Sequence, residues 1–422
     1  MSQEKSTVVI GGGIIGAMCA WYLRRSGHTV TIVEADGFGQ GCSWANCGFV
    51  CPSHILPLTT PGAVGKALRG LVRRNSPFSI RPRLSWSLWH WLANFARRCN
   101  QQAMLEAAPA IHELLHSSRQ LYAQLLAEWK IQCQWQQRGL LFVYQDAHEF
   151  EAYRDVDRLL QEHFGVAATA YPGDQVCELE PALKPGLGGG WHYPGDGHLR
   201  PDALMAGLRD LLIEQGVQLI EHTKVTGFRV EGNQARCATT ARGEVEGQTF
   251  VVATGALTPS LSRWLGMRIP IQPGKGYSIT TSLPSVVPTI PMILEQHSVG
   301  VTPFEDGYRL GSTMEFAGYD TSIRPRRLQL LRDGARIYLH QPYTEQVQSV
   351  WYGWRPMTWD GKPIVDRSPA MLNTWIAAGH NMLGLSMAPA TGKLIAELVN
   401  GQPPHLDPQP LTCHRFRTRT PA

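Results

Sequence analysis

The sequence predicts an α/β protein, in which a Rossmann-like domain that binds a dinucleotide is joined to a second, α+β substrate domain built on an antiparallel sheet. A glycine-rich turn between a strand and a helix near the N-terminus predicts the first domain. Short alternating strands separated by turn residues between positions 269 and 355 predict the second. The length of 422 residues exceeds one compact core and agrees with two domains.

The nucleotide-binding unit begins with an apolar, β-branched run. A strand, a glycine-rich turn, a helix and a second strand are predicted at 7–10, 11–16, 17–25 and 29–33. The turn reads Gly-Gly-Gly-Ile-Ile-Gly and stands in the context that the dinucleotide fingerprint requires. Gly11 permits the tight turn, Gly13 lets the backbone approach a pyrophosphate, and Gly16 lets helix and strand pack closely.

The ligand of this unit follows from the helix and the acid after the second strand. The helix N-terminus offers N–H groups and a positive dipole end to phosphates. Glu34 is expected to accept hydrogen bonds from a ribose and to repel a 2′-phosphate, which favours FAD or NAD over NADP. The cofactor-binding residues predicted here are Gly11, Gly13, Ile14, Ile15, Gly16, Glu34 and Ala35.

The region after Glu34 decides between FAD and NAD, because the strand–helix alternation stops there. A loop rich in glycine, cysteine, serine and proline is predicted at 37–61. Helices are then predicted at 84–99, 104–129 and 149–163, and strands at 138–144 and 190–193. A nicotinamide dehydrogenase normally continues its doubly wound sheet. The interruption therefore favours FAD, whose binding domain is commonly assembled from separated pieces.

The second piece of the nucleotide-binding domain is expected from Arg200 onwards. A helix is predicted at 201–215, followed by strands at 217–220, 224–230, 235–240 and 249–253. The antiparallel region contains predicted strands at 276–281, 292–295, 298–303 and 308–312 and a helix at 325–339. A strand at 373–378 and a helix at 388–399 complete the chain.

These elements predict a discontinuous domain arrangement. The FAD-binding domain is assigned residues 1–50, 198–265 and 352–402, and the substrate domain residues 51–197 and 266–351. Residues 403–422 form a tail rich in proline and arginine, expected to be extended or poorly ordered.

Composition restricts the compartment and the chemistry. No apolar run approaches the roughly 18 to 20 residues of a membrane span. The polar start leads directly into the first strand and leaves no room for a signal peptide, so a cytoplasmic protein is expected. The nine cysteines are expected to be reduced thiols. Cys42, Cys47 and Cys51 lie close together, but their spacing suits neither zinc nor an iron–sulfur cluster, and no metal is predicted.

The net charge of +5 is unevenly distributed. Between Asp36 and Glu106 there is no acidic residue, while basic residues stand at Lys66, Arg69, Arg73, Arg74, Arg81, Arg83, Arg97 and Arg98. Three tryptophans, Trp86, Trp89 and Trp91, accompany them. Residues 66–98 are interpreted either as a surface for the inner face of the cell membrane or as a helix packed into the second domain with a basic rim. Nucleic-acid binding is not expected.

Four further motifs resemble the FAD-dependent D-amino acid dehydrogenase (small subunit) family, in the D-amino-acid-oxidase/glycine-oxidase fold group. They are Cys-Ser-Trp-Ala-Asn-Cys-Gly at 42–48, Gly-Lys-Gly-Tyr-Ser at 274–278, Gly-Trp-Arg-Pro-Met-Thr at 353–358 and Gly-His-Asn-Met-Leu-Gly at 379–384. The resemblance runs from Val8 to about Gly401. Cys42, Cys47, Trp354 and Asn381 depart from the family's usual residues, so the substrates of relatives need not transfer.

The resemblance implies further cofactor contacts and a binding arginine. The residues carried over are Cys42, Ser43, Asn46, Cys47, Gly48, Val225, Ala253, Thr254, Gly255, Arg355, His380, Met382, Leu383, Gly384 and Leu385. Arg355 matches the arginine that holds the substrate carboxylate in this fold group. Gly353 falls where monomeric sarcosine oxidases carry the cysteine that bonds the flavin, so non-covalent FAD is implied.

The implied reaction transfers a hydride from Cα of a D-amino acid to flavin N5, and water then hydrolyses the imino acid. A planar guanidinium suits a carboxylate, which agrees with the role of Arg355. Tyr277 is interpreted as a second donor to the carboxylate or as an ordinary strand aromatic, and His380 and His54 as residues near the flavin and the pocket. Lys275 is placed near the flavin or in a surface salt bridge, and Glu315 matches a family position without an assigned role.

The expected enzyme is therefore an FAD-dependent D-amino acid dehydrogenase that passes electrons to a quinone or respiratory chain. Cyclic substrates such as D-proline or hydroxyproline isomers are suggested by the aromatic residues beside Arg355. One alternative is a glycine- or sarcosine-type oxidase that uses oxygen. The other is a flavoprotein subunit that only relays electrons.

Overall fold

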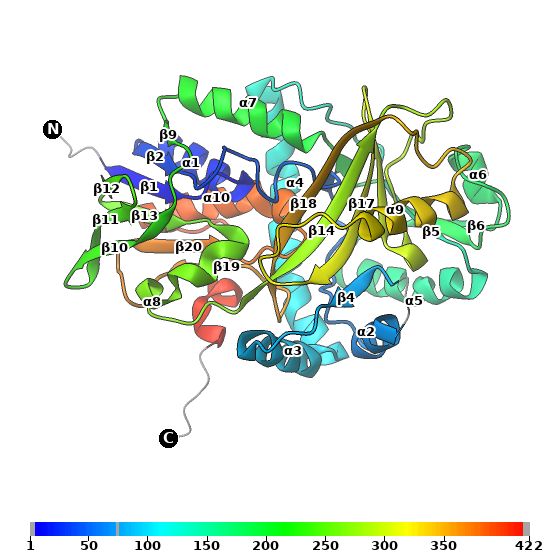
Figure 1. Ribbon diagram of the computed structural model, residues 1–422, viewed down its shortest axis with the longest axis horizontal. Coiled ribbons are helices and arrows are strands. Elements are labelled where there is room, and N and C mark those ends of the chain that lie inside the picture. The colour runs from blue at the N-terminus through cyan, green and yellow to red at the C-terminus, as the bar shows by residue number, and fades with distance from the viewer. Residues whose placement is uncertain (1–4, 73–75, 417–422) are drawn as a thin grey trace.

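The computed structural model describes residues 5–72 and 76–416, which form two large sheets with helices around them (Figure 1). Arg73 and Arg74 of the basic segment lie outside the described residues, as do positions 1–4 and 417–422. Among the described residues no helix is long and apolar enough to cross a lipid bilayer, and no disulfide joins their cysteines.

The six-stranded sheet carries the predicted nucleotide-binding unit. Its order is β19-β20-β13-β1-β2-β9, parallel except for β19. The strands are β1 (Ser6–Ile10), β2 (Thr29–Val33), β9 (Gln218–Ile220), β13 (Thr249–Val252), β19 (Ile364–Arg367) and β20 (Thr374–Ala378). Because side chains alternate along a strand, Val9 faces the helices and Val8 faces the opposite layer.

Different layers cover the two faces of this sheet. Helices α1 (Ile14–Arg25), α4 (Gln101–Trp129), α7 (Pro201–Glu214) and α10 (Gly384–Asn400) bury their apolar residues with Val9 on one face. A three-stranded sheet of β10 (Val225–Glu231), β11 (Gln234–Thr240) and β12 (Gly243–Glu246), with η1 (Gly255–Leu261) and α8 (Ser262–Leu265), covers the other.

Helix α4 differs from its predicted place. Its sequence position assigned it to the substrate domain, but Tyr122 donates a hydrogen bond to the Leu385 carbonyl of α10 over 2.8 Å. Ile111 and Leu114 are buried in the same core as α1. The helix therefore lies over the nucleotide-binding sheet, and the domain boundaries remain a proposal.

The second sheet has nine strands and is mostly antiparallel, as expected. Its path runs β18 (Val347–Thr358), β14 (Ile271–Thr281), β17 (Tyr308–Phe316), β16 (Val299–Pro303), β15 (Met292–Leu294), β5 (Leu140–Tyr144), β7 (Gly189–Tyr193) and β6 (Thr169–Pro172). The short strand β4 (Phe78–Ile80) pairs with β17 in parallel, as β15 does with β5. Helix α9 (Pro325–Tyr338) packs Leu331 and Ala335 against one face.

Several short elements were not predicted. They are α2 (Ala63–Val72), β4, β6, α6 (Gln175–Leu179) and β12, and also β3 (Phe49–Val50) paired with β8 (Gly197–His198). Helices α2 and α3 (Trp86–Arg98) lie along one edge of the molecule, with α5 (Ala147–Phe164) beside α2 (Figure 1). The unpredicted strands and α6 have seven residues or fewer and show no clear hydrophobic period, so tertiary contacts decide them. Helix α2 is amphipathic, and its pattern was missed just after the expected loop.

The C-terminal segment is more ordered than expected up to residue 416. Leu411 and Cys413, in η3 (Gln409–Leu411) and η4 (Cys413–Phe416), are buried. Arg415 forms an ion pair with Asp360, with 2.7 Å between Nε and Oδ2. The prediction of an extended tail was therefore wrong for this part, because buried apolar side chains and a paired arginine hold it on β19.

Candidate active site

The glycine-rich turn has the close backbone packing that the fingerprint requires. Gly11 adopts φ +110°, and a Cβ at Gly16 would lie 1.9 Å from the Gly11 carbonyl oxygen. The Gly12 N–H donates to Glu34 Oε2 over 2.6 Å. The Ile14 N–H donates to Ser43 Oγ over 2.9 Å, so the loop after β2 is tied to the start of α1.

A cavity of about 2670 Å³ runs from this turn to the nine-stranded sheet. Sites for small ligands usually measure roughly 300–1000 Å³, so this volume suits a dinucleotide together with a substrate. Every cofactor-binding residue predicted from the sequence lines the cavity except Gly16, which lies beneath the turn. Tyr277 and His54 also border it, whereas Lys275 and Glu315 do not.

Three side chains of the nine-stranded sheet fix the loop at 42–48. Ser278 Oγ donates to the Ala45 carbonyl over 2.8 Å. Arg309 donates from Nη1 to the Asn46 carbonyl over 2.8 Å, and Thr302 Oγ1 donates to the Cys47 carbonyl over 2.7 Å. Because the donors come from β14, β17 and β16, the nine-stranded sheet itself sets the position of the loop at 42–48, which we call the cofactor loop.

Glycines clear the face of the sheet below this loop. A Cβ at Gly300 would lie 2.9 Å from Cys47 Sγ, and one at Gly311 only 2.6 Å from it. A Cβ at Gly353 would lie 2.3 Å from the Trp351 ring. These glycines let Cys47 and Trp351 pack flat on the sheet, and the close turn and the large cavity together fit a flavin dinucleotide.

Arg355 presents its guanidinium on the same face. It pairs with Gly274 on β14, and its Nη1 lies 2.3 Å from the position that a Cβ on Gly276 would occupy. Nη1 donates to the Thr313 carbonyl over 2.9 Å, and Nη2 lies 3.3 Å from Ser312 Oγ. Burial lowers the pKa of Arg355, opposed by the nearby Cys42 and Cys47 thiols.

No carboxylate of the described residues forms an ion pair with Arg355, although the guanidinium lines the cavity. A desolvated charge without a partner is costly, and a carboxylate ligand would compensate it with paired hydrogen bonds. The backbone of β17 is irregular at Ser312 and Thr313, where φ is 144° and 45°. This irregularity places the Thr313 carbonyl where it accepts the hydrogen bond that orients the guanidinium.

Tyr277 does not present its hydroxyl to Arg355. Its neighbours Gly276 and Ser278 face the cofactor loop, so alternation turns Tyr277 to the α9 face. There its hydroxyl donates to Glu315 Oε2 over 2.7 Å. The prediction that Tyr277 donates to the substrate carboxylate does not fit this geometry, and the alternative of a strand aromatic does.

Lys275 shares that face and is fully buried. Its Nζ donates to the Ser322 carbonyl and lies 4.7 Å from the Tyr352 ring centroid. Trp354 also lies there, in edge contact with Tyr319. The placement of Lys275 near the flavin is therefore not supported, because a one-residue offset on a strand reverses the face.

The two predicted histidines are both held neutral. His380 Nε2 lies 3.0 Å from Thr391 Oγ1 in α10, and burial lowers its pKa to about 3. A proton-transfer role for its imidazole does not fit this value, although the residue lines the cavity. His54 stacks near Phe142, and burial lowers its pKa to about 4.

Comparisons with known proteins agree with this site. Residues 6–398 match the DAO family model, described as FAD dependent oxidoreductase. A D-amino acid dehydrogenase of Methylobacterium nodulans is 33% identical over 97% of this chain and 98% of the relative. The D-amino acid dehydrogenase of Granulibacter bethesdensis is 29% identical over 97% of this chain and 99% of the relative. Glycine oxidase of Geobacillus kaustophilus shares the fold with a TM-score of 0.80 and 22% identity, covering 98% and 99% of the two chains.

Proposed function

The chain belongs to the DAO family of FAD-dependent oxidoreductases, and we propose that it oxidatively deaminates D-amino acids as a dehydrogenase. FAD, the cofactor of this family, supplies the two-electron acceptor when bound. The glycine turn, the loop at 42–48 and the N-terminus of α10 would hold it. Gly353 leaves no thiol at the position where related oxidases bond the flavin, so we expect FAD to be held non-covalently.

The observation that carries this proposal is the guanidinium of Arg355, which lines the cavity and forms no ion pair with a carboxylate of the described residues. We expect it to bind the substrate α-carboxylate in a bidentate pair and so to orient Cα. Proximity and orientation contribute several kcal/mol to such reactions. We expect the substrate amine to lose its proton to water, because burial lowers the pKa of His54 to about 4 and makes its imidazole a weak base.

Trp351 lies on the same face as Arg355 and borders the cavity, which favours a compact apolar substrate such as a cyclic D-amino acid. Trp354 stands beside Arg355 in the sequence but lies on the opposite face of the sheet, so it does not support a cyclic substrate. Turnover of D-proline or hydroxyproline isomers with an artificial dye tests the class.

The electron acceptor is proposed to be a membrane quinone. Trp86 and Trp89 on α3 are 76% and 54% exposed, and Leu84 before them is fully exposed. Exposed basic residues accompany them at Lys66, Arg69, Arg81, Arg97 and Arg98. We call these residues the α2–α3 face; it combines apolar and basic groups, as a surface for anionic lipid does.

This face continues into the cavity. Lys66, Leu68 and Arg69 of α2 and Trp89 of α3 all border it. The rest of α3 packs inward, with Trp91 Nε1 donating to the Met357 carbonyl over 3.0 Å. The inner side of α3 therefore agrees with the packed-helix interpretation, and we propose that its exposed side contacts the membrane. An acceptor from the membrane would then approach along α2.

Anaerobic flavin absorbance tests the reaction directly. Purified yellow protein is mixed with single D- and L-amino acids, and we expect bleaching by particular D-isomers only. Electron delivery to a quinone analogue, with little hydrogen peroxide, supports the dehydrogenase. Peroxide stoichiometric with substrate would establish the oxygen-using oxidase instead, and a flavin that no amino acid bleaches would leave the electron-relay subunit.

A further inference from the structure

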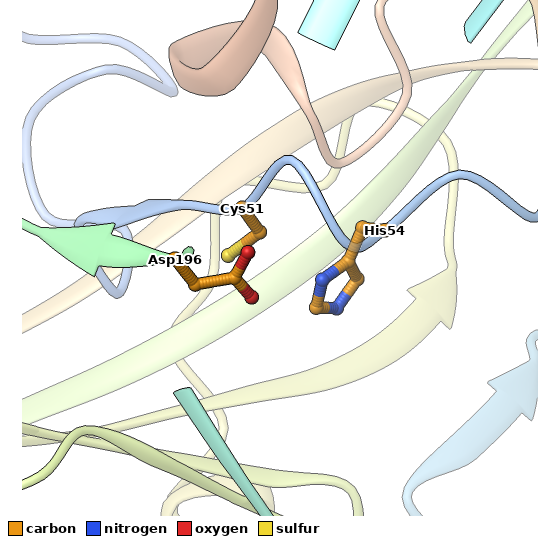
Figure 2. Close-up of side chains that lie close together, drawn as sticks. All are labelled: Cys51, His54 and Asp196. Atoms are coloured by element: carbon orange, nitrogen blue, oxygen red, sulfur yellow. The ribbon is translucent and has the colours of Figure 1, made fainter. Parts of the chain in front are cut away.

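A cluster of three potential metal ligands, of which Cys51 and Asp196 are buried and His54 is partly exposed, lies beside the loop at 42–48. Cys51 follows β3, His54 lies three residues later, and Asp196 stands in the turn between β7 and β8. One ligand atom from each lies within 4.8 Å of the others. Figure 2 shows the Cys51 sulfur and the His54 ring on either side of the Asp196 carboxylate. Cys51 is 2% exposed and Asp196 is completely buried.

Two features set this cluster apart from a chance grouping. Asp196 is held by Ser53, whose N–H donates to Oδ1 over 3.0 Å and whose Oγ donates to Oδ2 over 2.5 Å. These bonds orient the carboxylate and leave each oxygen a lone pair. His54 Nδ1 is buried, and no residue in the described part of the chain hydrogen-bonds it. In Figure 2 the Nδ1 edge of the ring faces Asp196.

We propose that Cys51 Sγ, a His54 ring nitrogen and an Asp196 carboxylate oxygen bind one zinc ion. Thiolate, imidazole and carboxylate are the ligands that zinc takes in proteins, and the two ligands on the loop have a Cys-x-x-His spacing. The thiol gives up its proton to solvent on binding, so the charge of the ion is offset by sulfur and carboxylate. Ser53 acts as the outer-shell group that orients the carboxylate.

The position of the cluster gives the ion a structural role. Cys51 and His54 border the large cavity, whereas Asp196 does not. The loop at 51–54 is joined to the cofactor loop by the short strand β3, and Asp196 belongs to the turn after β7 of the nine-stranded sheet. Zinc at this place would tie these two segments together.

A second group, Asp366, Cys413 and His414, provides a control within the same chain. Its Asp366 carboxylate accepts hydrogen bonds from the Cys413 and Arg367 N–H groups, and His414 is exposed. The first group lies in the segments after β3 and β7, and the second at β19 and η4, so substitutions can test them separately. The zinc proposal concerns Cys51, His54 and Asp196 alone and does not depend on the substrate of the enzyme.

The test uses the flavin-loaded protein. After chelator treatment and desalting, zinc chloride is titrated by calorimetry, and bound metal is counted by mass spectrometry. We expect one zinc per chain, proton release into the buffer and a higher melting temperature. Cobalt(II) should give absorption bands to the red of the flavin, as a thiolate-bound tetrahedral ion does.

Cys51→Ser and Asp196→Asn should each weaken zinc binding at least about tenfold, with the flavin-to-protein ratio kept as the folding check. Cys177→Ser and His414→Ala, which remove a thiol and an imidazole elsewhere, should bind like the parent. The proposal is overturned if the parent binds zinc with a Kd weaker than about 10 μM. It is equally overturned if His414→Ala abolishes binding while Cys51→Ser does not.

Discussion

Tyr277 and Arg355 lie on neighbouring strands of one sheet but point to opposite faces. The Tyr277 hydroxyl donates to Glu315 Oε2 over 2.7 Å beneath α9, while the guanidinium of Arg355 lies over Gly276 towards the cofactor loop. Glu315 also forms an ion pair with Arg324, with 2.9 Å between Oε1 and Nη1. The substrate face and the structural polar network are thus separated by the thickness of a single sheet.

Tyr277→Phe should therefore affect stability more than catalysis. Removing the hydroxyl leaves Glu315 with one donor fewer in a buried place, which costs about 1–3 kcal/mol of unfolding free energy. Urea unfolding followed by tryptophan fluorescence measures this, and substrate KM should change less than threefold. A large rise in KM at unchanged stability would instead restore Tyr277 as a donor to the carboxylate.

Arg355→Ala should impair substrate binding strongly. Removing the charged partner of a desolvated carboxylate costs roughly 2–5 kcal/mol, or about 30- to 4000-fold in kcat/KM. Arg355→Lys should recover only part of this, because an ammonium cannot form the bidentate pair. Anaerobic bleaching at a series of substrate concentrations measures the effect. Arg138→Ala, which removes an exposed arginine whose Nη1 donates to the Thr289 carbonyl, is the matched control.

Gly311→Ala should reduce FAD occupancy. Its Cβ would lie 2.6 Å from Cys47 Sγ, so the cofactor loop must shift, at a cost of about 1–3 kcal/mol. The ratio of flavin to protein absorbance and the melting temperature report the change. Adding Cys47→Ala should restore much of the loss by removing the clashing sulfur. Gly65→Ala, where a Cβ meets nothing within 4 Å, should lower neither the flavin-to-protein ratio nor the melting temperature.

The neutral His380 should make stability fall as the pH is lowered. Burial holds its folded pKa at about 3, whereas the unfolded residue takes up a proton below about 6.5. The unfolded chain then binds more protons, so stability is lost progressively from about pH 6.5 towards pH 3. The contribution lost at pH 5 is about 2 kcal/mol.

His380→Gln should therefore show a smaller difference in unfolding free energy between pH 7 and pH 5 than the parent does. Glutamine keeps a group that can hydrogen-bond Thr391, so the comparison isolates the titration. His414→Gln, on the surface, controls for the loss of an imidazole. Equal pH slopes in His380→Gln and the parent would show that His380 does not titrate differently on folding.

The α2–α3 face should bind anionic membranes. The double variant Trp86→Ser/Trp89→Ser removes two exposed rings without touching the buried Trp91, and should lower binding to phosphatidylglycerol vesicles at least about tenfold. Vesicle flotation measures this, and added salt should weaken the binding of the parent. Ile213→Ser on α7, which Figure 1 places away from α3, is the control. Equal flotation of the double variant and the parent would contradict the membrane-binding role of the α2–α3 face.

Sequence patterns predicted the nucleotide-binding residues correctly where these residues lie close together in the chain. The turn at 11–16, its flanking strands and the acid at Glu34 form one continuous segment, and each lies where it was predicted. Arg355 could be identified because it stands inside a distinctive motif. The unusual cysteines at 42 and 47 were visible as departures from the family pattern, but the packing of Cys47 on Gly311 was not.

Sequence could not place residues whose role depends on strand register or on distant partners. The face on which Tyr277 and Lys275 lie follows from the pairing of β14 with β17 and β18, which no local period reveals. Helix α4 crosses to the nucleotide-binding sheet because its buried stripe matches α1 and α10. The spacing of Cys51 suggested no metal because its partner Asp196 lies 142 residues beyond His54.

The sequence by itself therefore determined the cofactor class and the nucleotide fingerprint, and it predicted Arg355 as the arginine for the substrate, because these depend on residues close together in the chain. Only the tertiary structure decided which face of the substrate sheet is reactive and which residues merely support it. It also assembled the cluster of Cys51, His54 and Asp196. The physical reason is that side chains alternate across a sheet and distant loops meet only when the sheets pack, so orientation and proximity are properties of the folded chain.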